Sequence, residues 1–341
     1  MILVTGGTGL VGAHLLLHLT HDNVAVRAIY RDIKSIEKTK SLFRMYQKEQ
    51  LFLNIDWVQA NIIDVPSLEK AFINVDTVYH SAGLISYDPK DENVLRKINI
   101  EGTANIVNFC IHNKIKKLCH VSSIAALGNL AAHENNVSSK SEKAKQITEE
   151  NEWNPEIPHS DYAISKYGAE MEVWRGQQEG LKVIIVNPGV IFGTGFWNQG
   201  SGKFFSAIKK GFPFYTNGST AYIGVTDVVQ IMIQLMASDN IGERYILVAE
   251  NLTFKNVIFQ IAGHLKVKRP TIEVKPWLLN IAWRIDWLLS TFFITQRKLS
   301  KYSANSLISS DFISNKKIKK ALNYDFQGID DVIKEVTSMH K

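Results

Sequence analysis

Cysteine is scarce in this chain: its 341 residues include two, Cys110 and Cys119. Two cysteines cannot form the disulfide framework of a small secreted scaffold. Cys110 falls in a predicted helix and Cys119 in a predicted strand, so we expect both to be reduced and buried. The sequence shows no charged-then-apolar leader before its first predicted strand, which favours a cytoplasmic protein.

The sequence also lacks a basic stripe interleaved with aromatic residues, an internal repeat and a low-complexity tract. Its net charge is +6 and its isoelectric point about 9.0. Such a balance suits nucleic acid, an anionic membrane or an anionic ligand. Without a basic stripe we expect scattered surface lysines and an anionic cofactor, and no nucleic-acid partner. A hydrophobic content of 45% is ample for a sizeable core.

No long hydrophobic run is free of charge. The most apolar stretch, 277–294, carries Arg284 and Asp286 near its middle. Charges at the centre of a bilayer are costly, so a transmembrane span is not expected. An amphipathic helix is favoured, which caps the substrate pocket, packs on the domain, or rests on a membrane surface. Trp277, Trp283 and Trp287 keep peripheral membrane contact open.

The first twelve residues form the most informative pattern that is present. A short apolar run leads into a glycine-rich turn, and a helical pattern follows at once. In a dinucleotide site, Gly6 permits the turn, Gly9 lets the backbone approach a pyrophosphate, and Gly12 lets the helix pack closely on the strand. We expect the cofactor to contact the whole loop: Thr5, Gly6, Gly7, Thr8, Gly9, Leu10, Val11 and Gly12.

Strand and helix patterns alternate through the first half of the chain. Strands are predicted near 2–4, 24–30, 56–59, 77–80, 118–122, 182–187 and 244–248. Helices are predicted near 10–19, 67–72, 93–112 and 162–180. This alternation predicts a Rossmann-type α/β fold with a doubly wound parallel sheet. We expect a dinucleotide-binding domain over 1–190, completed by the strand near 244–248, and a smaller substrate-binding region over 191–341. The polar stretch 129–157 is an expected excursion.

Tyr162 and Lys166 form a second pattern, four residues apart on a predicted helix. This spacing places both side chains on one face of the helix. A neighbouring ammonium lowers the pKa of a phenol, so we expect a lowered pKa for Tyr162. Such a tyrosine exchanges a proton with a carbonyl or alcohol oxygen.

Together these patterns resemble the extended branch of the short-chain dehydrogenase/reductase superfamily, which includes the NAD-dependent epimerase/dehydratase family and dihydroflavonol-reductase-like and sterol-dehydrogenase-like members. Further matching segments follow in the order of that family: His80-Ser81-Ala82-Gly83, Asn99-Ile100-Glu101-Gly102-Thr103, Val121-Ser122-Ser123 before Gly128, Asn187-Pro188-Gly189-Val190, and Val225-Thr226-Asp227-Val228. The resemblance covers nearly the whole chain.

The resemblance implies a role for each matching residue. Tyr162 is the general acid/base, Lys166 holds the nicotinamide ribose, and Ser123 binds the substrate oxygen, with Ser122 as a competing candidate. Asn99 either anchors a proton-relay water or is structural. The remaining cofactor contacts are expected at Arg31, Asn61, Ile62, Ser81, Ala82, Gly83, Pro188, Gly189 and Val190.

The end of the second predicted strand bears on the choice between NADP and NAD. Arg31 follows that strand and Arg27 lies within it, a pattern that resembles the family's NADPH reductases, because an arginine accommodates a 2′-phosphate. Asp32 complicates this reading, since a carboxylate binds an unmodified ribose. We favour NADP weakly over NAD. Asn61 is expected to accept a hydrogen bond from the adenine amino group, and Asp64 to cap the next helix.

Three functions compete. The first is an NAD(P)-dependent oxidoreductase acting on a carbonyl or alcohol of a small apolar or aromatic substrate. The second is a nucleotide-sugar epimerase or dehydratase, and the third a non-catalytic NADP sensor. Dehydratases of the family place an Asp-Glu pair where this chain has Ile124 and Ala125, and its nucleotide-sugar enzymes often carry an arginine shortly before the Val225 motif, where 218–225 contain none. Lys203, Lys209 and Lys210 could substitute for that arginine, so epimerisation is weakened and stays open. Substrate contacts are expected at Ile85, Tyr87, Ser123, Phe192 and Trp197.

Two further expectations concern assembly and metals. The helices flanking the active site often form a dimer interface in similar proteins, so a homodimer is possible. His14 and His18 lie four residues apart on the first predicted helix, but no third ligand is evident. We therefore expect no metal.

Overall fold

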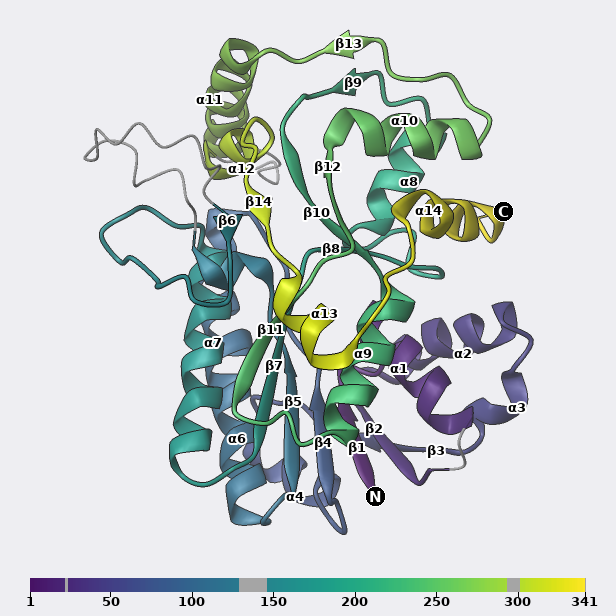
Figure 1. The fold of residues 1–341 in the computed structure, drawn as a ribbon, viewed down its shortest axis with the longest axis vertical. Coiled ribbons are helices and arrows are strands. Elements are labelled where there is room, and N and C mark those ends of the chain that lie inside the picture. Colours follow the sequence, from purple (N-terminus) through teal and green to yellow (C-terminus); the bar gives the residue numbers. More distant parts are fainter. Residues whose placement is uncertain (22–23, 129–145, 293–300, 341) are drawn as a thin grey trace.

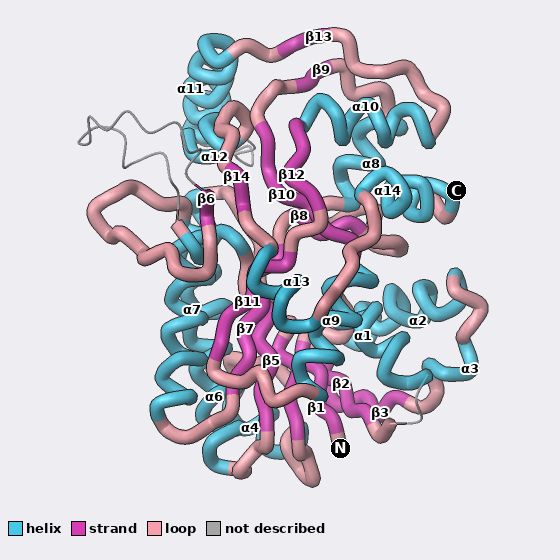
Figure 2. Tube along the Cα trace, in the orientation of Figure 1, coloured by secondary structure: helices cyan, strands magenta, loops and turns pink. Residues whose placement is uncertain are grey.

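A seven-stranded parallel sheet forms the centre of the computed structural model, which describes residues 1–21, 24–128, 146–292 and 301–340. Figures 1 and 2 show the sheet in the lower half of the molecule. Its strand order is β11-β7-β5-β4-β1-β2-β3. The strands are β1 (Ile2–Thr5), β2 (Val26–Tyr30), β3 (Ile55–Gln59), β4 (Thr77–His80), β5 (Lys117–Val121), β7 (Val183–Pro188) and β11 (Glu243–Leu247). Successive strands are added in one direction from β1 to β3 and in the opposite direction from β4 onward, so the strand order reverses between β1 and β4. Such sheets bind nucleotides at this point of their carboxyl edge.

Helices cover both faces of this sheet. One face carries α1 (Leu10–His21) and α9 (Val225–Ala237), and the other carries α4 (Val65–Ala71), α6 (Gly102–His112) and α7 (Asp161–Gln178). Each face has its own buried apolar cluster. Strands buried on both faces are apolar throughout, and all six residues of β7 are buried. The predicted Rossmann-type fold is confirmed.

The predicted elements agree with the observed ones to within two residues, apart from two differences. The expected helix over 93–112 is interrupted: α5 (Glu92–Leu95) leads into the π-helical turn η3 (Arg96–Glu101), and α6 follows. The sequence analysis also missed α2 (Ile36–Met45) and α3 (Glu49–Phe52), which precede β3, and it predicted neither α9 nor, in the C-terminal part, α8 (Gly202–Lys209), α10 (Phe254–His264), α13 (Lys316–Leu322) and α14 (Ile329–Ser338). Cys110 on α6 and Cys119 on β5 are buried and unpaired, as expected.

A smaller region occupies the upper half of the molecule (Figure 1). It is built on a three-stranded sheet of β8 (Val190–Phe192), β10 (Ser219–Gly224) and β12 (Glu250–Thr253). The helices α8 (Gly202–Lys209), α10 (Phe254–His264) and α14 (Ile329–Ser338) bury an aromatic and aliphatic core against it. Two short pairs of strands complete the region: β9 (Phe214–Tyr215) with β13 (Ile272–Glu273), and β6 (Gln146–Ile147) with β14 (Phe312–Ile313).

The chain passes between the two regions more than once. After β8 it returns to the large sheet as α9 and β11, and again as α13 (Lys316–Leu322). The helices α11 (Pro276–Phe292) and α12 (Lys301–Ser306) lie at the top of the smaller region (Figure 1). Most of the excursion expected at 129–157 lies outside the described residues, as does the end of the stretch 277–294.

Candidate active site

The glycine loop follows β1 at the carboxyl edge of the sheet. Gly6 has φ of +72°, and a Cβ there would lie 2.7 Å from the backbone nitrogen of Ala82. A Cβ on Gly12 would lie 2.2 Å from the carbonyl oxygen of Gly6. The N–H of Gly9 donates to that same carbonyl at 2.9 Å. Two of the three glycines therefore meet backbone that no larger residue tolerates.

The loops after β1 and β4 are joined by hydrogen bonds. Ser81 Oγ donates to the carbonyl of Thr5 at 2.7 Å, and the N–H of Ala82 donates to Thr5 Oγ1 at 3.2 Å. Below them, His80 bridges Thr5 and Thr103 with its two ring nitrogens. Burial lowers the pKa of His80 to about 3, so this imidazole is neutral. The predicted residues of the first and fourth strand ends thus form one rigid edge.

Tyr162, Lys166 and Ser123 meet beside this edge. Tyr162 and Lys166 are buried on the first turns of α7, and Ser123 follows β5. Lys166 Nζ donates to the carbonyl of Val121 at 2.8 Å, while Tyr162 hydrogen-bonds Ser123. A Cβ on Gly83 would lie 3.3 Å from Asn99 Oδ1 and 3.9 Å from Lys166 Nζ, so Gly83 lies beside both side chains.

The pKa values of this pair differ from the expectation. Burial raises the pKa of Tyr162, and the hydrogen bond with Ser123 opposes the rise without cancelling it. The expected lowering of this pKa is therefore wrong for the chain alone, because desolvation of the phenolate and the neighbouring Tyr87 both raise the pKa. Burial also lowers the pKa of Lys166 to about 8, and the carboxylate of Glu170 opposes that shift.

Glu170 is part of a buried polar group that the sequence analysis missed. Its Oε1 accepts from Asn187 Nδ2 at 2.5 Å, and its Oε2 lies 3.6 Å from Arg244 NH1. Asn187 Nδ2 also donates to the carbonyl of Ser123. Ser122, the competing serine, is also buried, and its hydroxyl opposes the rise that burial causes in the pKa of Glu170. The spacing of Glu170, four residues after Lys166, was the available signal.

Asn99 lies in the π-helical turn η3 with a nearly saturated amide. Its Oδ1 accepts from the N–H of Leu84 at 2.7 Å, and its Nδ2 donates to the carbonyl of Leu84 and to Ser165 Oγ. Ser165 in turn donates to the carbonyl of Tyr162. These bonds link the loop after β4 to α7. They support the structural alternative for Asn99.

The family model of the NAD dependent epimerase/dehydratase family matches residues 2–248. The chain belongs to this family. It is therefore an NAD(P)-dependent enzyme of the kind that the sequence resemblance implied. Its fold agrees with the solved structure of gox2253, with a TM-score of 0.79 and 24% identity over 99% of this chain and 97% of that one.

Two curated relatives align over most of both chains. A putative dihydroflavonol 4-reductase of Synechocystis sp. is 28% identical over 290 residues, 82% of this chain and 77% of that protein. Sterol demethylase protein B of Methylococcus capsulatus is 26% identical over 316 residues, 90% of this chain and 88% of that protein. These names describe the two relatives, which this chain resembles.

The structure separates the residues expected to line the substrate site. Tyr87 lies against Tyr162, with ring centroids 5.7 Å apart, and Ile85 of the same loop is exposed. Phe192 is completely buried between Phe205 and Tyr222, so its expected place at the substrate is wrong. Phe192 is the last residue of β8, which belongs to the core of the smaller region.

The aromatic neighbours of Trp197 belong to the smaller region and are different from those of Tyr87. The Trp197 ring packs 4.2 Å from that of His340, which follows α14, and 6.4 Å from that of Phe205. Pro188, Gly189 and Val190 connect the two sheets, and a Cβ on Gly189 would lie 2.5 Å from the carbonyl oxygen of Ala221. This close approach explains why position 189 is occupied by glycine.

The basic residues of β2 differ in their roles. Arg27 Nε donates to Asp56 Oδ2 at 2.7 Å, and its NH1 donates to carbonyls at the end of α4, including that of Ile73 at 2.8 Å. Arg27 is thus structural. Arg31, at the carboxyl end of β2, is exposed. The Asp32 carboxylate accepts from the N–H of Lys34 and caps its own turn.

The residues after β3 make local contacts. Asn61 Oδ1 accepts from the N–H of Ile63, which uses one lone pair of the oxygen expected to face adenine. Ile62 is buried, and its carbonyl accepts from Asn105 Nδ2. Asp64 stands at the start of α4 but makes no side-chain capping bond, so this expectation is wrong. Ser67 Oγ donates to the backbone carbonyl of Asp64.

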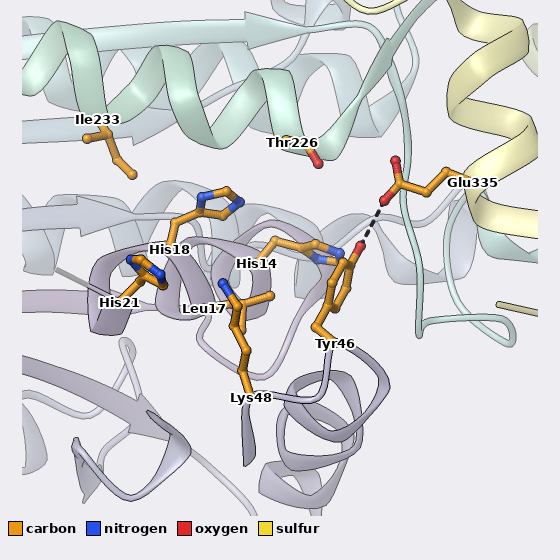
Figure 3. A pocket seen from close by; sticks show the side chains of 9 residues that line it. All are labelled: His14, Leu17, His18, His21, Tyr46, Lys48, Thr226, Ile233 and Glu335. Atoms are coloured by element: carbon orange, nitrogen blue, oxygen red, sulfur yellow. Dashed lines mark hydrogen bonds between the residues drawn. The ribbon is translucent and has the colours of Figure 1, made fainter. Parts of the chain in front are cut away.

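A groove of about 400 Å³ lies outside this constellation, between α1, α9 and α14 (Figure 3). His14, Tyr46 and Glu335 line it, and Tyr46 donates to Glu335 Oε1 at 3.2 Å. His14 Nδ1 donates to the carbonyl of Leu10, and burial lowers the pKa of His14 to about 4. None of the predicted catalytic residues lines this groove, which marks the seam between α14 and the large sheet. Within the described residues, no three metal-ligating side chains are grouped to hold an ion.

Proposed function

We propose that this enzyme transfers a hydride between a nicotinamide dinucleotide and a carbonyl or alcohol of a small apolar or aromatic substrate. The observation that carries the proposal is the meeting of Tyr162, Ser123 and Lys166 beside the glycine loop. The diphosphate would lie on Gly6 to Gly12, with the helix dipole of α1 behind it. The hydride is the chemistry that the bound cofactor supplies.

Each side chain has one task in this proposal. Tyr162 gives its proton to the substrate oxygen, which suits a phenol whose raised pKa keeps it protonated. Ser123 donates to the same oxygen as charge develops there. Lys166 holds the ribose hydroxyls beside Gly83 and, when charged, favours the phenolate that forms. Tyr87, against the ring of Tyr162, bounds the substrate.

The cofactor is proposed to be NADP, bound in preference to NAD. Arg31 is exposed at the end of β2, where the adenosine ribose lies in such folds, and its guanidinium suits a 2′-phosphate. The carboxylate of Asp32 is engaged by its own turn. This engagement supports the preference for NADP.

Oxidation of NADPH and NADH, assayed across ketones, aldehydes and UDP-sugars, tests the proposal. We expect net NADPH oxidation with an apolar or aromatic carbonyl compound. Conversion of a UDP-sugar without net oxidation would instead indicate an epimerase. Binding of cofactor with no turnover of any compound would indicate a sensor.

Tyr162→Phe tests the assigned acid. We expect turnover to fall by about a thousandfold or more, because proton transfer is lost, while NADPH binding persists in a fluorescence titration. Tyr167→Phe is the matched control on the same helix, since Tyr167 stacks on Trp153, 4.4 Å between centroids. Full activity in Tyr162→Phe would remove this residue from the mechanism.

A further inference from the structure

The helix α11 has an unusual distribution of side chains. Leu279 and Ser290 are its buried residues, and Trp283 and Asp286 are partly covered. These four positions, spaced by four, three and four, form one narrow face. The exposed apolar face of α11 has seven large side chains, with exposed fractions of 37% to 58%: Trp277, Leu278, Ile281, Ile285, Trp287, Leu288 and Leu289. The polar residues Asn280 and Arg284 are exposed beside them.

A surface helix of a globular protein normally turns its apolar face inward. In α11 the acidic residue Asp286 lies on the packed side, and the exposed apolar face contains no carboxylate. No helix among the described residues is long and apolar enough to cross a bilayer. The exposed apolar face of α11 is therefore suited to lying on another surface and not to spanning a bilayer.

A second group of exposed apolar side chains occupies the same end of the molecule. Phe214 of β9 pairs in register with Ile272 of β13, and Phe212 contacts Phe214 with ring centroids 5.6 Å apart. All three are 40% to 47% exposed. Figure 1 shows β9, β13 and α11 together at the end opposite the N-terminus. Only Val274 and Lys275 separate β13 from α11.

The chain segments that carry these groups are mainly basic. The exposed cations of segments 201–215 and 264–284 are Lys203, Lys209, Lys210, Lys266, Lys268, Arg269, Lys275 and Arg284. The same segments contain one acidic residue, Glu273, whose Oε1 accepts from Asn217 Nδ2. Arg284 also lies 4.6 Å from the ring centroid of Trp283.

We propose that α11, together with the β9–β13 tip, docks on an anionic lipid bilayer. Tryptophan and aliphatic side chains enter the headgroup boundary, and the surrounding lysines and arginines meet the lipid phosphates. A second copy of this chain would bring like charges together at the same face, whereas an anionic lipid supplies the opposite charge. This docking does not depend on the reaction proposed above.

Co-sedimentation with vesicles tests the docking directly. We expect the full chain to bind phosphatidylcholine vesicles that contain phosphatidylglycerol, to bind pure phosphatidylcholine weakly, and to dissociate as salt is raised. Ile281→Glu with Leu288→Glu is expected to lower the partition coefficient by more than about tenfold, because the charges oppose entry into the apolar layer.

The matched control places the same charges on exposed apolar residues next to the large sheet, away from α11. Leu53→Glu with Ile73→Glu changes side chains that are 75% and 56% exposed, and should leave vesicle binding unchanged. Lys275→Glu with Arg284→Glu should lower binding to the anionic vesicles, whereas Lys38→Glu with Lys70→Glu should lower it far less. All four variants are expected to keep the circular dichroism spectrum of the wild type.

Three outcomes would overturn the proposal. The first is a wild-type chain that binds neither kind of vesicle. The second is equal binding by the α11 variant and its control. The third is a dimer, seen by analytical ultracentrifugation, that Ile281→Glu with Leu288→Glu dissociates; the face would then be an interface between copies.

Discussion

The carboxyl edge of the large sheet and the smaller region hold their residues by different means. At the edge, polar loops are joined by hydrogen bonds, and glycines stand where a Cβ would meet backbone within 3 Å. In the smaller region, aromatic side chains such as Phe192, Phe205 and Tyr222 interlock in an apolar core. The first arrangement fixes polar loops against one another, and the second packs an apolar core beneath the outer surface of the smaller region.

The comparison is tested most strongly by Phe192→Ala. Phe192 is completely buried, so its loss should lower the free energy of unfolding by about 3–5 kcal/mol, through lost apolar contact and the cavity left behind. Urea denaturation measures this change. Tyr87→Ala is the control, since Tyr87 is 55% exposed and should affect the Michaelis constant more than stability. A stable Phe192→Ala with a raised Michaelis constant would return Phe192 to the substrate site.

The steric limit at the edge is tested by Gly12→Ala. The new Cβ would lie 2.2 Å from the Gly6 carbonyl oxygen, and we expect about 2–3 kcal/mol of destabilisation together with loss of NADPH binding. Calorimetry and a fluorescence titration measure the two effects.

Gly263→Ala is the matched change in the smaller region. Gly263 lies within α10, and a Cβ there meets nothing within 4 Å. Replacing a helical glycine by alanine should raise stability by about 0.5–1 kcal/mol. If both glycines tolerated alanine equally, the steric limit assigned to Gly12 would not hold.

The same contrast explains how far the sequence predicted the fold. Strands of a parallel sheet are buried on both faces, so their apolar runs are distinct, and the seven predicted strands match the observed ones closely. The helices α2 and α3 were missed because their charged residues obscured the apolar positions that face α1. The smaller region combines segments far apart in the chain, such as β8, α10 and α14, and local patterns do not indicate which of them meet.

The site was predicted in a similarly uneven way. Glycine positions and the Tyr162–Lys166 spacing follow from local geometry, so they were found from the sequence. Glu170, Asn187 and Arg244 become neighbours only through the pairing of β5, β7 and β11. Phe192 was misplaced because an aromatic residue after a strand end looks the same whether it faces a ligand or a core.

Arg31→Ala tests the carboxyl edge of the large sheet at the adenosine end of the cofactor site. Removing the guanidinium should raise the Michaelis constant for NADPH by about tenfold, the equivalent of a lost charge-assisted contact, and should leave that for NADH nearly unchanged. Steady-state assays with both cofactors measure the difference. Lys38→Ala is the control for a general loss of positive charge. Equal effects on the two cofactors would reverse the preference for NADP.

Glu170→Gln has the smallest expected effect of these substitutions. It tests whether the buried carboxylate of Glu170 changes the pKa of Lys166. The carboxylate of Glu170 favours the charged lysine, so its removal should lower the pKa of Lys166 from about 8. If an ammonium is required at position 166, activity is lost as pH rises through that pKa. The alkaline limb of kcat/KM should therefore move to lower pH, by about one unit or less. Glu172→Gln, in the next turn but paired with Arg175 at the surface, should leave the limb in place. An unmoved limb in Glu170→Gln would mean that Glu170 supports Asn187 and the strand end without acting on the charge of Lys166.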